Sequence, residues 1–233
     1  DLSTKRTREL GAYVSNQFIF NEELSLRAGI RFTAWQNIGP ATEYEIIPAG
    51  DDIARDSLSV SSHPEGQVYH TSLAADPRLS MIWRPADRHV IKASYSRTSQ
   101  FQYLITNSIS PFTSLEVWLP ASPNVLPQVA HQFTLGYMHY FGRGINFGLE
   151  GYYKKMKHLI DYRDHARMLM NPLVEYELRF GEGEAYGLEF ILNKEGGRLS
   201  GWLSYTLSRA IYRVEDINSG LPYPAYSDRP HDF

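Results

Sequence analysis

Two glutamates stand where they could bind a cation together. Glu150 lies within an alternating segment, five residues beyond its start at Ile145. Glu189 lies five residues before another such segment ends, at Lys194. If the two segments are neighbouring strands, the carboxylates sit at similar heights on one face, where like charges repel each other unless a cation lies between them. The spacing therefore favours a cation-binding pair, and the alternative is two solvated carboxylates neutralised by Lys154.

A second candidate pair consists of Arg31 and Asp76, which fall at comparable heights on the segments that flank residues 37–68. We predict an ion pair between them on the same face as the glutamates. The eight histidines lack the HxxxH and HxH spacings of metal sites, and no G-x-S-x-G motif is present. We expect no catalytic residue, no metal site and no cofactor, so the chain is not predicted to be an enzyme.

The elements that carry these charges alternate between apolar and polar residues with a period of two. In residues 24–36, the even positions from Leu24 to Ala34 are apolar, while the odd positions from Ser25 to Thr33 hold Ser, Arg, Gly and Thr. Such a period indicates a strand with one apolar and one wet face. The pattern recurs in four pairs of segments, each joined by a short turn: 9–20 with 24–36, 71–84 with 89–100, 129–141 with 145–154, and 185–194 with 199–209.

The lengths of these segments indicate a membrane protein. Most are about 10 to 14 residues long, whereas strands of globular proteins have about 5–6 residues and membrane-crossing strands need about 9–11. Long connections follow the pairs, at roughly 37–68, 101–127, 157–183 and 211–233. Short turns at one rim and long loops at the other are typical of outer-membrane barrels. The sequence therefore predicts an all-β fold, with about eight strands of an antiparallel transmembrane β-barrel.

Composition agrees with this interpretation. The 233 residues include 16 Tyr and 11 Phe, and the net charge of −3 without a basic stripe argues against nucleic-acid binding. The lack of cysteine removes any disulfide framework or thiolate metal site. No apolar run is long enough for a membrane helix, and the first residues do not form a signal peptide. We expect that a leader has been removed or that the chain is an internal segment.

The two faces of the predicted wall carry different residues. Charges would cost about 2–4 kcal/mol each near the middle of a bilayer, so the charged positions mark the face away from lipid. They are Arg27, Arg31, Asp76, Arg78, Lys92, Glu150, Lys154 and Glu189. Aromatic girdles are predicted at both rims: Phe18, Phe20, Trp83, Tyr137, Tyr140 and Phe141 near the short turns, and Tyr153 and Tyr205 further out. The alternative is that Tyr and Phe are simply good strand formers.

Several segments carry distinctive residue combinations. They are Glu150–Met156 (EGYYKKM), Leu159–Tyr162 (LIDY), Gly183–Phe190 (GEAYGLEF), Gly201–Arg209 (GWLSYTLSR), Lys92–Arg97, Leu126–Gln132 and Asp228–Asp232. Together they resemble the barrel domain of TonB-dependent outer-membrane receptors, in the form common among Bacteroidetes. The resemblance covers most of the chain.

The resemblance implies that residues 1–233 are part of a barrel of about 22 strands, with the plug domain that closes its lumen and the terminal strands outside this chain. It implies active import of a scarce nutrient (a ferric chelate, glycan, peptide or cofactor) across the outer membrane of a Gram-negative bacterium. Energy would come from the TonB–ExbB–ExbD complex, and a surface lipoprotein is a further candidate partner. Glu150 and Glu189 look like the positions whose carboxylates latch plug arginines in such receptors.

In the connection 101–127, aromatic faces beside hydrogen-bonding groups would suit sugars or chelates. The candidate substrate contacts are Phe101, Tyr103, Phe112 and Trp118, and the slightly favoured alternative is that these aromatics pack the loop itself. Two other folds remain open. A closed eight-stranded barrel with a structural or adhesive role would pair residues 199–209 with 9–20, and a soluble β-sandwich binding module would cover its apolar face with a second sheet.

Overall fold

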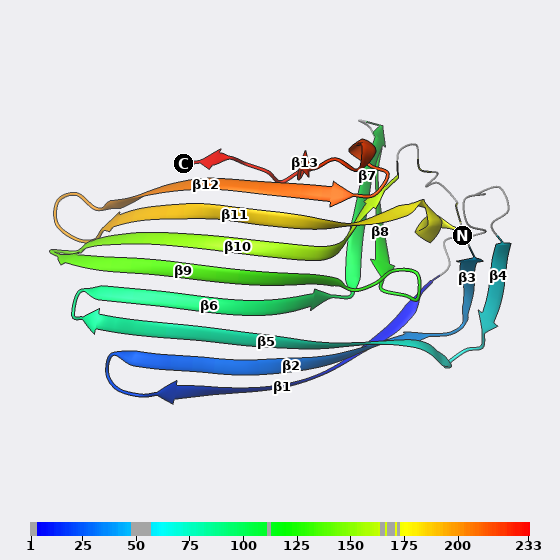
Figure 1. Cartoon of the computed structure of the whole chain (residues 1–233), viewed down its shortest axis with the longest axis horizontal. Coiled ribbons are helices and arrows are strands. Elements are labelled where there is room, and N and C mark those ends of the chain that lie inside the picture. Colours follow the sequence, from blue (N-terminus) through cyan, green and yellow to red (C-terminus); the bar gives the residue numbers. More distant parts are fainter. Residues whose placement is uncertain (1–3, 48–56, 111–112, 164–165, 167–170, 172) are drawn as a thin grey trace.

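The computed structural model describes residues 4–47, 57–110, 113–163, 166, 171 and 173–233. Its main element is one antiparallel sheet of ten strands, whose long members run side by side across Figure 1. In sheet order they are β1 (Arg6–Ile19), β2 (Leu24–Ile38), β5 (Val68–Ala86), β6 (His89–Gln100), β9 (Gln128–Gly142), β10 (Ile145–Tyr162), β11 (Leu178–Lys194) and β12 (Gly201–Val214). The short strands β13 (Tyr223–Pro224) and β14 (His231–Asp232) both pair with β12. The prediction of an antiparallel all-β fold is confirmed.

Register keeps the apolar positions of neighbouring strands on one face. Between β2 and β5, for example, Phe32 lies opposite Ala75 and Ala34 lies opposite Leu73. These apolar side chains stay uncovered, with Leu73 78% exposed and Leu135 of β9 62% exposed. An apolar surface of this extent marks contact with another apolar phase. The β-sandwich alternative is therefore wrong, because no second sheet covers the apolar face in the described part of the chain.

The two ends of the sheet do not meet. β1 stands at one end of the strand order and β12, with the short strand β13, at the other, and among the described residues no ladder joins β1 to β12. A closed eight-stranded barrel would need that pairing, so this alternative is wrong as well. No helix in the described part of the chain is long and apolar enough to cross a membrane.

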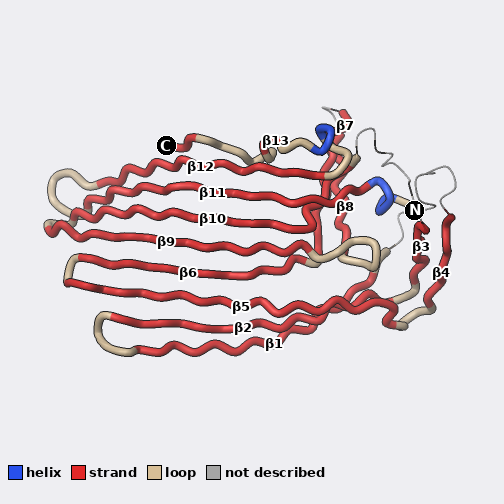
Figure 2. Tube along the Cα trace, in the orientation of Figure 1, coloured by secondary structure: helices blue, strands red, loops and turns tan. Residues whose placement is uncertain are grey.

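Two of the long connections contain hairpins of their own, where the sequence analysis expected irregular loops. They are β3 (Ala41–Ile47) with β4 (Ser57–His63), and β7 (Gln102–Ser110) with β8 (Thr113–Pro120). Figure 2 shows both at the end of the sheet opposite the short turns. The other two connections are shorter than expected, because β10, β11 and β12 extend beyond the alternating segments, and they hold the 3₁₀ turns η2 (Val174–Glu177) and η3 (Asn218–Gly220).

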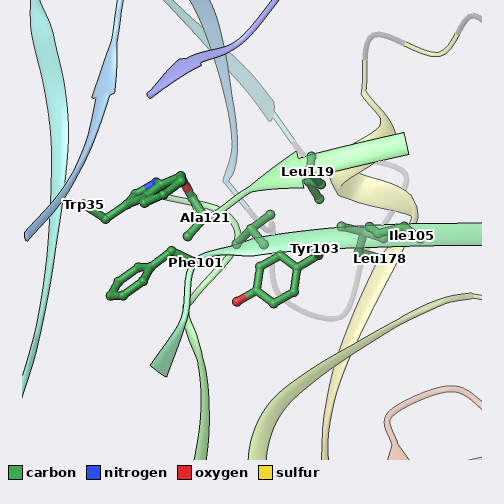
Figure 3. Packing of buried hydrophobic residues seen from close by; sticks show 8 residues of the cluster. Trp35, Phe101, Tyr103, Ile105, Leu119, Ala121 and Leu178 are labelled. Atoms are coloured by element: carbon green, nitrogen blue, oxygen red, sulfur yellow. The ribbon is translucent and has the colours of Figure 1, made fainter. Parts of the chain in front are cut away.

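The hydrophobic core lies where these connections gather, and not within the sheet. Its buried members are Trp35, Phe101, Tyr103, Ile105, Leu119, Ala121, Val125 and Leu178. Figure 3 shows the rings of Trp35 and Phe101 beside each other, with Ala121 next to them. Trp35 is an odd-numbered residue of β2 and therefore points to the wet face. The chain that follows β6 thus folds over the wet face of the wall.

Candidate functional site: the wet face of the wall

Glu150 and Glu189 are register partners in the ladder between β10 and β11, and both side chains are exposed. In the described part of the chain, no ion pair joins either carboxylate to Lys154 or to another cation. The arrangement places two negative charges side by side on the wet face, open to a partner from the enclosed side.

Gly136 leaves room for one of these carboxylates. It is the β9 residue opposite Glu150, and a Cβ atom built on it would lie 3.2 Å from Glu150 Oε2. The Glu150 side chain therefore lies over the glycine, where a larger residue would crowd it. Lys92 of β6 lies opposite Gly136 from the other side. The row Lys92–Gly136–Glu150–Glu189 is thus basic at one end and acidic at the other.

Arg31 and Asp76 are also register partners, on β2 and β5, but they do not form the predicted ion pair. Arg31 Nη2 donates to Glu9 Oε1 at 2.8 Å. Asp76 Oδ1 accepts from Arg97 Nη1 at 2.7 Å. A residue within a sheet has a neighbouring strand on each side. Arg31 pairs with β1 instead of β5, and Asp76 pairs with β6 instead of β2. The prediction identified the right row and the wrong partners.

Arg97 was missed because it stands at an apolar position of the alternating pattern in β6. The ladder between β5 and β6 is regular from the pair Trp83–Ile91 to the pair Arg78–Ser96, and beyond Arg78–Ser96 the strands separate. Arg97 Nη1 then donates to the backbone oxygen of Ala75 at 2.8 Å and to Ser99 Oγ at 3.0 Å. Alternation predicts side-chain direction only while the ladder is regular. Here the Arg97 guanidinium, and not a backbone N–H of β6, donates to the Ala75 carbonyl.

Pro77 accounts for the separation of β5 and β6. The N–H and C=O of one residue in a strand point to the same side, and this side alternates along the chain. The carbonyl of Ala75 faces the gap, so Pro77, two residues later, faces it as well. Proline has no N–H to donate there, which ends the ladder. Asp76, between them, is 5% exposed and accepts a second hydrogen bond from Ser99 Oγ at 2.8 Å.

A pocket of ≈ 350 Å³ opens on the wet face at this separation. Its lining is polar and charged over an aromatic base, and consists of Glu9, Arg31, Thr33, Trp35, Asp76, Arg78, Thr98, Ser99, Gln100, Phe101 and Gln102. The base is held firmly. The Trp35 and Phe101 rings stack with centroids 5.6 Å apart, and Trp35 Nε1 donates to the Ala121 carbonyl at 3.3 Å.

The four candidate substrate contacts do not act as one surface. Phe101 and Tyr103 are 7% and 5% exposed within the core, so they pack the connection itself, as the alternative held. Trp118 is 61% exposed and remains accessible. Phe112 lies outside the described residues. Sequence alone could not separate these cases, because an aromatic residue in a long connection suits packing and binding equally.

Tyr103 anchors the connection through its hydroxyl. The carbonyl oxygens of Gln100 and Leu126 both lie 2.9 Å from the hydroxyl and share its one proton, and the hydroxyl accepts from the backbone N–H of Gln128 at 2.6 Å. Burial raises the pKa of Tyr103 to about 12. The phenol is therefore neutral at any physiological pH, and it ties the start of β7 to the chain that leads into β9.

A further group of contacts joins separate connections. Asn124 Nδ2 donates to the Tyr44 carbonyl of β3 at 2.8 Å and to Glu175 Oε2 of η2 at 3.0 Å. Glu175 also bonds Lys5, which precedes β1. Beside it, Arg163 Nη2 donates to Glu177 Oε1 at 3.0 Å, and this hydrogen bond raises the pKa of the Arg163 guanidinium. The connections thus form one hydrogen-bonded cap at their end of the wall.

The outward face carries aromatic rows at two levels. Tyr95, Phe133, Tyr153 and Tyr186 are successive register partners across β6, β9, β10 and β11. Nearer the short turns, His139 contacts Phe141 edge to face at 4.3 Å, and His89 Nδ1 lies 2.7 Å from Tyr137 Oη. Tyr205 was expected beside Tyr153, but it lies opposite Phe190, four residues closer to the short turns than Tyr186. Six residues separate the two rows on β9, from Phe133 to His139, which is about 20 Å along the strand.

Comparisons with known proteins agree with this geometry. The family model described as TonB dependent receptor-like, beta-barrel, matches residues 1–230. Among solved structures, the FrpB iron transporter from Neisseria meningitidis (F3-3 variant) is similar in fold, with a TM-score of 0.60 and 13% sequence identity. The match covers 95% of this chain and 28% of that one. The search of curated proteins found no match.

The family match spans nearly the whole chain, and the fold has the long antiparallel strands, uncovered apolar face and one-sided connections that such a barrel requires. The chain lies in the outer membrane of a Gram-negative bacterium. It belongs to the TonB-dependent receptor family, as a segment of the β-barrel.

Proposed function

We propose that this chain forms part of the barrel wall of a receptor that imports a scarce nutrient across the outer membrane with energy from the TonB–ExbB–ExbD complex. The observation that carries the proposal is the sidedness of the sheet. Its outward face is apolar and uncovered, while its other face holds charged residues and a folded cap of connections. A wall of this kind separates lipid from an enclosed polar space, as a transport barrel requires.

The opposed carboxylates support a more specific role. Glu150 and Glu189 lie opposite each other on the enclosed side, and both are exposed without a basic partner in the described part of the chain. Two adjacent carboxylates suit a guanidinium, which can donate to both at once. We propose that arginines of a plug domain in the lumen bind this pair and hold the plug closed until TonB pulls on it.

The nutrient belongs to the classes that such receptors take up: ferric chelates, glycans, peptides or cofactors. The name of the structurally similar FrpB protein points to iron for that protein. For this chain, the cap of connections is the proposed site of capture, and a surface lipoprotein is a candidate partner there.

Uptake by cells tests the proposal. A strain that lacks the gene should fail to grow when its nutrient is limiting, in a screen across the four classes, and the gene on a plasmid should restore growth. Inactivating TonB should abolish growth on the same nutrient. Growth that needs the gene but not TonB would refute energy coupling, and normal growth without the gene on every nutrient would refute import.

A further inference from the structure

The pocket at the separation of β5 and β6 has its own electrostatic character. It is lined by two carboxylates, and both are already bound: Glu9 by Arg31, and Asp76 by Arg97. The two guanidiniums of the lining are not saturated. Arg31 uses Nε for Thr33 Oγ1 and Nη2 for Glu9, which leaves Nη1. Arg78 is exposed and makes no hydrogen bond or ion pair within the described residues.

The two arginines are positioned to act together. Arg31 lies opposite Asp76 and Arg78 lies opposite Gly29, so the two arginines are diagonal neighbours on the wet faces of β2 and β5. Diagonal neighbours have Cα atoms about 7–8 Å apart, within the reach of two long side chains that converge on one group. A guanidinium presents its N–H groups in a planar fork that matches a carboxylate. One anionic group between them would receive donors from both.

Small residues keep this space open. Gly11 lies opposite Thr33, and a Cβ atom built on it would be 2.8 Å from Arg31 Nη2. The guanidinium therefore rests against the β1 backbone at a glycine. Gly29 leaves the position opposite Arg78 without a side chain. The two glycines thus leave the side chains of both arginines room on this face.

The remaining lining is neutral and forms hydrogen bonds. Thr98, Gln100 and Gln102 supply hydroxyl and amide groups at the rim, above the stacked rings of Trp35 and Phe101. Such groups suit hydroxyls of a ligand, since each can donate and accept. The pocket volume of ≈ 350 Å³ is within the range of small-molecule sites.

We propose that this pocket binds a carboxylate-bearing, hydroxyl-rich small molecule of the acidic-sugar class, with Arg31 and Arg78 holding the carboxylate. The proposal rests on the proposed import function for its purpose, because a site on the enclosed face would lie on the path of the nutrient. Its binding step can be measured without transport.

The test uses the purified full-length receptor in detergent, with D-glucuronate as the probe and D-glucose as its neutral counterpart. The two sugars differ only in the carboxylate at C6. Calorimetry should show saturable binding of glucuronate that weakens as salt is added, because the contact is ionic. Glucose should bind at least tenfold more weakly.

Variants locate the site. R78Q and R31Q should each weaken glucuronate binding at least tenfold. G11V keeps both charges but displaces the Arg31 guanidinium, and it should weaken binding as well. R27Q is the matched control, because Arg27 is on the same face of β2, bonds Gln17 and does not line the pocket. It should leave the affinity unchanged.

The outcomes separate this inference from the import function. No saturable binding of glucuronate, equal binding of glucose, or binding that R78Q and R31Q leave intact would overturn the pocket proposal, whatever the cells transport. If glucuronate binding to the purified receptor depends on Arg31 and Arg78 but cell growth never needs the gene, the pocket proposal is upheld and import is refuted.

Discussion

Glu150 and Glu189 face each other directly across the ladder between β10 and β11, with no basic side chain bound to either in the described part of the chain. Like charges placed directly opposite in a sheet are destabilising unless another group neutralises them. If plug arginines supply that neutralisation, the double variant E150Q/E189Q should fold and insert normally and yet import its nutrient several-fold more slowly.

Uptake of the labelled nutrient and the amount of receptor in purified outer membranes are the two measurements for this pair. E184Q is the control. Glu184 also lies on β11, but its side chain points to the face of the sheet opposite that of Glu189. Uptake by E150Q/E189Q equal to that of E184Q would exclude a role of the carboxylates in holding a plug.

The outward direction of the apolar face predicts a steep penalty for charge. Leu135 is 62% exposed in the middle of this face, and Ser94 is exposed on the wet face of the neighbouring strand β6. L135K should reduce the free energy of folding into lipid vesicles by about 2–4 kcal/mol, because a lysine there must enter hydrocarbon. S94K should change it by less than about 1 kcal/mol. Urea titration in vesicles measures both, and a larger loss for S94K would reverse the assignment of the faces.

Sequence alone predicted the membrane-crossing part of the fold well, because a period of two is imposed by lipid on one side and water on the other. Strands such as β2 and β9 match their alternating segments to within a few residues. Outside the bilayer that constraint ends, and the hairpins β3–β4 and β7–β8 were missed. The start of β7 does alternate, with Phe101, Tyr103 and Ile105 buried and Gln102 and Leu104 exposed, but so short a stretch was assigned to a loop.

The candidate sites show the same division. Register within a regular ladder was predictable, and the row containing Glu150 and Glu189 follows from counting residues from the turn. The partners of Arg31 and Asp76 were not predictable, because they depend on the order of the strands in the sheet and on the end of the β5–β6 ladder at Pro77. The pocket itself requires residues from β1, β2, β5, β6 and the start of β7. Contacts of that kind arise from the fold and leave no local pattern.

Trp35 holds the connection that follows β6 onto the wall. It is 5% exposed, stacks on Phe101 and donates to the Ala121 carbonyl, which also accepts from Asn37 Nδ2 at 2.9 Å. W35F keeps the stacking and loses one hydrogen bond, so it should weaken this docking by about 1 kcal/mol. W35A also leaves a cavity and should cost about 3–5 kcal/mol.

Hydrogen exchange of the backbone amides in residues 101–127 measures this docking in the detergent-solubilised receptor. Faster exchange should appear in W35A, weakly in W35F, and in neither case in the membrane-crossing part of β9. W118A is the control, because Trp118 belongs to the same connection but is 61% exposed. Equal protection in W35A and W118A would contradict the anchoring role of Trp35.

Tyr103 makes the same connection sensitive to alkaline pH. Burial raises its pKa to about 12, against an ordinary value of about 10. Between these values the opened connection loses the phenolic proton and the docked one keeps it, so docking is fully stable below pH 10 and weakens as the pH rises. The loss approaches about 3 kcal/mol near pH 12.

Cleavage of residues 101–127 by an alkali-tolerant protease should therefore accelerate above pH 10. Y103F cannot ionise and should be cleaved somewhat faster at pH 8, because it lacks the hydroxyl bonds, but with less acceleration above pH 10. Parallel pH profiles for the two proteins would show that another group controls the connection.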